Sequence, residues 1–259
     1  MNLIWLFGAE LKRGWILQRR YVVETIALMI GLTLVFCGLL VSTQNLVGPD
    51  VQLGDRLDAL VVSYVLWSLS LFIMGNIAGE LQQEAQTGTL EQLFLSPIRA
   101  AQLLIIRALA NLAPQLVINL AILILIMAIT GNWLSFSLFA LPPLITVLLS
   151  AYGLSLVLGS LALLFKKVQQ VLAVFQFLLF FMLMAPMETW TGPSYLLGWL
   201  LPITPSAGLL RNVISYGAPL DWILVLLALL NSALYLGLGL LLFHWAERKA
   251  KKYGGLGGY

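Results

Sequence analysis

Charged residues are scarce in this chain: 10% of its 259 residues are Asp, Glu, Lys or Arg, whereas 61% are hydrophobic. Soluble globular domains carry about 25% charged residues, so the composition excludes the usual globular classes and indicates a protein with several membrane spans. In hydrocarbon, each backbone N–H and C=O must be paired inside its own segment. The expected fold is therefore an all-α membrane protein with one domain over residues 1–259.

Cysteine and histidine are nearly missing, and a nucleotide-binding loop is missing altogether. Cys37 and His244 are the only residues of their types, too few for an intrachain disulfide or an ordinary zinc site. The chain has no GxxxxGK[ST] sequence to bind ATP phosphates, so we expect no cofactor on it. The sequence pI of about 9.1 requires no nucleic acid partner, because basic residues beside membrane spans attract anionic lipid headgroups.

Six apolar stretches are long enough to cross a membrane, given that a spanning helix needs roughly 20 apolar residues. The predicted spans are residues 22–41, 57–78, 100–130, 138–165, 168–185 and 222–245. Pro and Gly are dense between residues 186 and 220, which prevents a continuous helix there. Irregular backbone at membrane depth must be buried in protein or line a wet cavity. We therefore predict short re-entrant helices on the outer side, before the sixth span.

The two ends of the chain are expected to lie outside the hydrocarbon. Residues 1–20 are too polar to span, yet apolar residues recur there at helical spacing: Leu3, Ile4, Phe7 and Leu11. This pattern predicts an amphipathic helix along the inner membrane surface. Residues 253–259 are predicted to form a flexible tail.

Basic residues predict the orientation, because Lys and Arg beside spans are retained in the cytoplasm. With the N-terminus inside, 12 of the 14 Lys and Arg residues fall on the cytoplasmic side, and only Arg56 and Arg211 fall outside. Both termini are thus expected in the cytoplasm, with the chain in the plasma membrane, which is the inner membrane in a bacterium. The same orientation places residues 80–97, between the second and third spans, in the cytoplasm.

Residues 79–97, GELQQEAQTGTLEQLFLSP, form a strongly polar insert. Thr89 and Gln92 have the spacing of a capping box, and Ser96 followed by Pro97 is a second helix start. The pattern predicts a short amphipathic helix across the end of the bundle, and by itself it also fits an ordinary interfacial loop helix. The order TGTLEQLFLSP, after a Glu and Gln cluster, closely resembles the signature of permease subunits in the type-2 family of ATP-binding-cassette (ABC) transporters.

The resemblance covers most of the chain, including the proline-punctuated stretch LLPITPSAGLLR at residues 200–211. It implies that two permease copies, expected as a homodimer, pair with two ABC ATPase subunits that bind ATP and Mg. It also implies that the insert is the coupling helix that docks on an ATPase. The matched coupling residues are Glu84, Gly88, Thr89, Leu90, Glu91, Leu93 and Pro97, to which Phe94 adds an apolar side chain suited to a partner's groove. The matched residues of the external segment are Pro202, Pro205 and Arg211.

A polar row follows the third span at intervals of four residues: Arg107, Asn111, Gln115 and Asn119. Residues four apart drift slowly around one helix face, and polar side chains in a membrane normally face protein or water. One interpretation is that the row lines the translocation path. The other is that it makes interhelical hydrogen bonds to Gln176, Asn231 or Ser232, with Arg107 snorkelling to the surface.

Together these features predict the membrane subunit of an ATP-driven exporter for an amphipathic, hydrophobic or lipid-linked compound. A polysaccharide or haem exporter permease of the same family is the neighbouring alternative. Alternatives of another class are a non-transporting membrane scaffold and an intramembrane serine protease using Ser155 and His244. The protease is disfavoured because Ser155 lies about 15 Å along its helix from the inner end, where His244 is expected.

Overall fold

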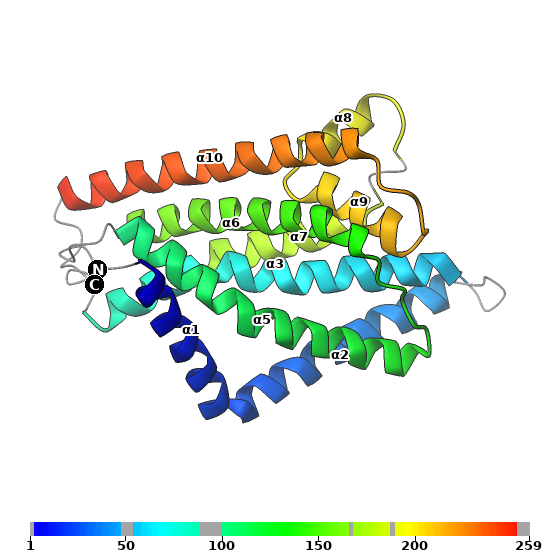
Figure 1. The fold of residues 1–259 in the computed structure, drawn as a ribbon, viewed down its shortest axis with the longest axis horizontal. Helices are drawn as coiled ribbons and strands as arrows, with labels where there is room; N and C mark the ends of the chain where they lie inside the picture. The colour runs from blue at the N-terminus through cyan, green and yellow to red at the C-terminus, as the bar shows by residue number, and fades with distance from the viewer. Residues whose placement is uncertain (1–2, 48–53, 89–99, 166–167, 187–189, 253–259) are drawn as a thin grey trace.

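The computed structural model describes residues 3–47, 54–88, 100–165, 168–186 and 190–252, and all its regular elements in those ranges are helices (Figure 1). The long helices are α2 (Val22–Val47), α3 (Gly54–Gln86), α5 (Ala100–Thr130), α6 (Leu141–Leu164) and α10 (Trp222–Lys252). The others are α1 (Leu3–Arg20), η1 (Leu138–Ala140), α7 (Gln169–Met184), α8 (Pro193–Leu200) and α9 (Thr204–Ile214). The prediction of an all-helical chain with membrane-length apolar helices is confirmed.

Five helical segments are long and apolar enough to cross a membrane: Val22–Gln44, Leu57–Gln86, Gln102–Thr130, Leu138–Leu164 and Trp222–Lys252. They coincide with five of the six predicted spans. The remaining one corresponds to α7, whose 16 residues rise only about 24 Å, against a hydrocarbon core about 30 Å thick. A sixth crossing, by α7, therefore stays a prediction.

The most buried of these segments belongs to α6, which packs against α3 and, over its largest interface, against α10. Small residues allow α6 to pack closely against both α3 and α10. A Cβ on Gly159 would lie 2.7 Å from Ile77 Cγ2 of α3, and one on Gly153 would lie 2.6 Å from the Tyr235 carbonyl carbon of α10. A Cβ on Gly239 would meet the Gly153 carbonyl oxygen. Helices α6 and α10 thus cross with their backbones in contact, as small residues permit in membrane bundles.

The helices form an elongated bundle with two different ends (Figure 1). Helices α3, α5, α6, α7 and α10 run roughly along the long axis, whereas α1 and α2 meet at an angle on one side. The start of α1, the end of α3, the start of α5 and the end of α10 lie at one end, and α8 and α9 lie at the other. Residues Leu3–Arg20 form helix α1, which packs along α5, and its predicted place on the inner membrane surface stays a prediction.

Helix α3 continues past residue 78, where the second span was predicted to end, and runs unbroken to Gln86. It stops where Thr87 N–H donates to the Gln83 carbonyl at 2.9 Å and Gly88 adopts a φ of 72°. This left-handed conformation ends helices and favours glycine. The first part of the insert therefore extends α3 and does not begin a separate helix. Residues 89–99 and the predicted tail at 253–259 lie outside the described residues.

Candidate functional site

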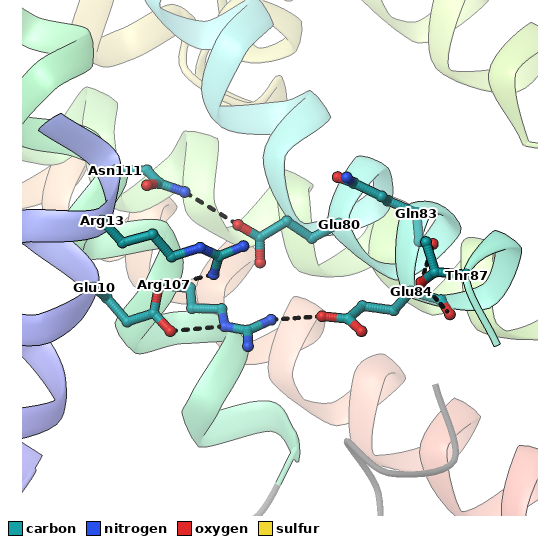
Figure 2. Close-up of polar contacts among 8 residues, drawn as sticks. All are labelled: Glu10, Arg13, Glu80, Gln83, Glu84, Thr87, Arg107 and Asn111. Carbon is teal, nitrogen blue, oxygen red and sulfur yellow. Dashed lines mark hydrogen bonds and ion pairs between the residues drawn. The ribbon is translucent and has the colours of Figure 1, made fainter. Parts of the chain in front are cut away.

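The guanidinium of Arg107 joins three helices at the end of the bundle where α3 stops (Figure 2). Its Nε donates to Glu10 Oε1 of α1 at 3.1 Å, and its Nη1 donates to Glu84 Oε1 of α3 at 2.9 Å. Arg13 adds a bond from the exposed side of α1, with Nη1 3.0 Å from Glu10 Oε2. Because the planar guanidinium presents several donors in fixed directions, one residue of α5 holds two carboxylates on different helices.

A third carboxylate, Glu80, lies one helical turn before Glu84 on α3. Glu80 Oε1 accepts a hydrogen bond from Asn111 Nδ2 at 3.1 Å, and its Oε2 is buried without a hydrogen bond in the described part of the chain. In Figure 2, Glu80 and Asn111 lie beside the Arg107 cluster, facing each other from α3 and α5. The last turns of α3 are thus held to α5 at two successive positions, Glu80 and Glu84.

A cavity of about 460 Å³ lies next to these contacts, between α1, α3 and α5. Asn111 takes part in the carboxylate contacts and in the cavity wall, because it donates a hydrogen bond to Glu80 and also lines the cavity. Five amide side chains share the lining: Gln18, Asn76, Asn111, Gln115 and Gln176. The buried Nε2 of Gln115 forms no hydrogen bond within the residues that the structure describes. The cavity wall therefore offers donors and acceptors to an occupant.

The polar row of α5 shows both arrangements that the sequence allowed: it makes interhelical hydrogen bonds, and part of it lines a cavity. Arg107 and Asn111 bond carboxylates, and Asn119 Oδ1 accepts a buried hydrogen bond of 2.6 Å from Ser68 of α3. Asn111 and Gln115 also line the cavity. Two of the predicted interhelical partners bond elsewhere: Asn231 Nδ2 donates to the Trp199 carbonyl and Ser232 Oγ to the Thr146 carbonyl. Gln176, the third predicted partner, lines the same cavity as Asn111 and Gln115.

Of the residues matched to the coupling motif, the structure describes Glu84 and Gly88. Glu84 is ion-paired to Arg107, and Gly88 forms the turn that ends α3. The remaining matched residues lie outside the described residues: Thr89, Leu90, Glu91, Leu93, Phe94 and Pro97.

The matched residues of the proline-rich segment before α10 include a buried arginine. Arg211 of α9 is 2% exposed, and its Nη1 donates to Ser63 Oγ of α3 at 2.9 Å and to the Leu183 carbonyl of α7 at 2.8 Å. Pro205 lies in the first turn of α9, where a missing N–H costs nothing. Pro202 precedes Ile203, which has a φ of 66° and donates its N–H to Ser150 Oγ at 3.1 Å. The segment forms two short helices, as predicted, and Arg211 fixes the second to the bundle.

The proposed serine and histidine pair does not form. Ser155 Oγ donates to the Met74 carbonyl of α3 at 3.4 Å, and His244 Nδ1 lies 2.8 Å from the Leu240 carbonyl of its own helix. Both side chains are thus bonded to backbone at separate places.

Sequence reasoning singled out Arg107 and Glu84 but missed Glu10, Arg13 and Glu80 as part of this cluster. A signal was present in the composition of the helices. Glu10 is the only acidic residue of α1, and Arg107 is the only charged residue of α5. Charged residues that are isolated in this way are the natural candidates for pairing with each other.

Comparisons with known proteins assign no family to the chain. No family model matches the sequence, and no curated protein matches it significantly. Its function is therefore inferred from its own residues and their geometry.

Proposed function

We propose that the chain is the permease subunit of an ATP-driven ABC exporter, coupled through its insert to a separate ATPase. The observation that carries the proposal is the position of Glu84. This residue belongs to the insert, whose order resembles the type-2 ABC signature, and it is ion-paired to Arg107, which also holds Glu10 of α1. The insert is thus connected to α1, α3 and α5, which supply most of the cavity wall, with Tyr152 of α6 and Gln176 of α7 completing it.

The proposed mechanism follows from this connection. Closure of the ATPase subunits on ATP displaces the insert, and α3 takes up the displacement directly because it runs unbroken to Gln86. Arg107 passes the displacement to α5 and α1, since charge-assisted hydrogen bonds are among the strongest side-chain links. The three helices then tilt together and the path opens outward.

The proposed assembly has two permease copies and two ATPase subunits, with ATP and Mg bound by the ATPases. Both termini and the insert face the cytoplasm from a plasma membrane, and the cargo is an amphipathic, hydrophobic or lipid-linked compound. Six spans per subunit, with α7 as the short fifth, meet this topology.

The test is purification of the tagged full chain from its native membrane, followed by measurement of Mg-dependent ATP hydrolysis. We expect an ATPase with a phosphate-binding loop, identified by mass spectrometry, to copurify with the wild type. Glu91→Lys and Leu93→Asp should lower the recovered hydrolysis by about ten-fold or more, because both place an unpaired charge in the docking surface. Glu24→Lys is the matched control, since Glu24 is exposed at the start of α2. Unchanged hydrolysis and transport in both insert variants would remove the coupling role.

A further inference from the structure

We infer that the cavity between α1, α3 and α5 binds the uncharged, hydrogen-bonding head of an amphiphile within a single copy of the chain. The inference deepens the proposed function, on which it rests for treating the occupant as cargo. The binding itself is a property of the described residues and can be measured without an ATPase.

The chemistry of the wall selects an uncharged head. Five amides line the cavity, and the described residues of its lining include no Asp, Glu, Lys or Arg. Amides donate and accept hydrogen bonds equally, which suits hydroxyl or amide groups. An ion in this cavity would lose its hydration without a countercharge on the wall. Gln115 contributes to this wall as a residue, while its Nε2 is itself buried and forms no hydrogen bond within the described chain.

The size and remaining lining of the cavity suit an amphiphile. Its volume of about 460 Å³ lies in the usual range of small-molecule sites, roughly 300–1,000 Å³. Apolar side chains complete the wall, among them Leu17, Phe72 and Leu112. A water-filled polar pore would not need them.

A second cavity of about 400 Å³ is lined by other residues of the same two helices, together with residues of η1, α6 and α9. Gln115 of α5 lines the first cavity and Leu116 lines the second. On α3, the first cavity is lined from Leu71 to Asn76 and the second from Val62 to Leu69. The second lining is almost wholly apolar, with Asn119 held in a hydrogen bond to Ser68. The order along α3 and α5 is therefore polar and then apolar, which matches the head and the hydrocarbon of one amphiphile.

The wall that α1 contributes depends on a glycine. A Cβ on Gly14 would lie 3.2 Å from Asn111 Oδ1 and 3.5 Å from Pro114 Cγ. Any larger side chain there would project among the residues of the cavity wall. Gly14 therefore lets α1 lie close to α5 while the space between them stays open.

The experiment uses the purified full chain in lipid nanodiscs, without ATPase. The probe is a dodecyl glucoside that carries a photoreactive diazirine at the start of its alkyl chain. The matched probe has the same chain and a sulfate head. We expect the glucoside to label peptides of α3 and α5, and unlabelled dodecyl glucoside to compete for the site. The sulfate probe should leave these peptides unlabelled.

Substitutions in the cavity wall test whether the photoreactive probe binds in this cavity. Gln115→Leu and Asn76→Leu should each weaken competition by about three- to ten-fold, the effect of one hydrogen bond. Gln169→Leu is the matched control, because Gln169 is an exposed amide at the start of α7. Size-exclusion profiles and thermal unfolding check that each variant is folded.

Two outcomes would overturn the inference: equal labelling by both probes, or unchanged labelling when Gln115 and Asn76 are both replaced by Leu. The proposed function can be tested separately from binding at this cavity. Glu91→Lys should leave labelling intact while it lowers ATPase recovery, so loss of one result does not imply loss of the other.

Discussion

Arg107 and Glu84 form an ion pair of 2.9 Å between α5 and the last turns of α3, with 16% and 22% of their side chains exposed. Arg107→Gln should lower the free energy of unfolding by about 1–3 kcal/mol, because the partly buried carboxylates of Glu10 and Glu84 would each lose the Arg107 guanidinium. Arg107→Lys should recover only part of the loss, since an ammonium lacks the guanidinium fork. Denaturant unfolding in detergent micelles measures the change.

The control for this prediction is Arg13→Gln. Arg13 pairs with Glu10 and its side chain is 53% exposed, so its loss should cost less than about 1 kcal/mol. Equal losses in Arg107→Gln and Arg13→Gln would contradict a central role for Arg107.

The contact between α6 and α10 can be tested with two glycines of one helix. Gly239→Ala should destabilise the protein by about 1–3 kcal/mol, because the added methyl group meets the Gly153 carbonyl oxygen. Gly237→Ala meets no atom within 4 Å and should stabilise α10 by up to about 1 kcal/mol. Thermal unfolding should show a lower midpoint for Gly239→Ala and an unchanged or higher midpoint for Gly237→Ala. A shift in the same direction in the two variants would argue against close packing.

The external segment should depend on Arg211. Arg211→Ala leaves an empty space and an unpaired Leu183 carbonyl, so we expect a loss of about 3 kcal/mol or more and faster proteolysis between α8 and α9. Arg248→Ala is the control, because Arg248 is an exposed arginine of α10 and should tolerate the change. Equal proteolysis of the two variants would show that Arg211 does not fix α9.

The number of crossings can be decided with reporter fusions after Gly131, Gly192 and Lys252. If α7 crosses, the reporters after Gly131 and Gly192 lie outside and the one after Lys252 lies inside. If α7 does not cross, Gly192 is inside and Lys252 is outside. The second pattern would remove the shared cytoplasmic location of the two termini.

Apolar length predicted the long helices well, because membrane-length runs have few alternative structures. The third predicted span, residues 100–130, coincides with α5. The end of α3 was predicted eight residues too early, at 78 rather than Gln86. Glu80 and Glu84 mark a change of polarity, but a helix needs only its own backbone bonds to continue, and it ends where Gly88 turns.

The cluster around Arg107 could not be predicted in the same way. Glu10 and Arg107 are 97 residues apart, and their contact depends on how α1 lies along α5. Spacing within α5 located the polar row, but the partners predicted for it were Gln176, Asn231 or Ser232, whereas Asn111 bonds Glu80 and Asn119 bonds Ser68. The hydrogen-bond partners of the row depend on how α3 packs against α5, and tertiary packing cannot be deduced from a local sequence pattern.

The glycine crossing of α6 and α10 also has a consequence for biosynthesis. Among the described residues, helix α6 holds the most buried membrane-length segment, yet its largest partner, α10, is synthesised after the other described helices. Until the ribosome has released Trp222–Lys252, the groove at Gly153 has no backbone to fill it. The contact between α6 and α10 therefore forms only after Trp222–Lys252 has been synthesised, and a chain that stops before α10 presents an unfilled groove to the quality-control proteases of the membrane.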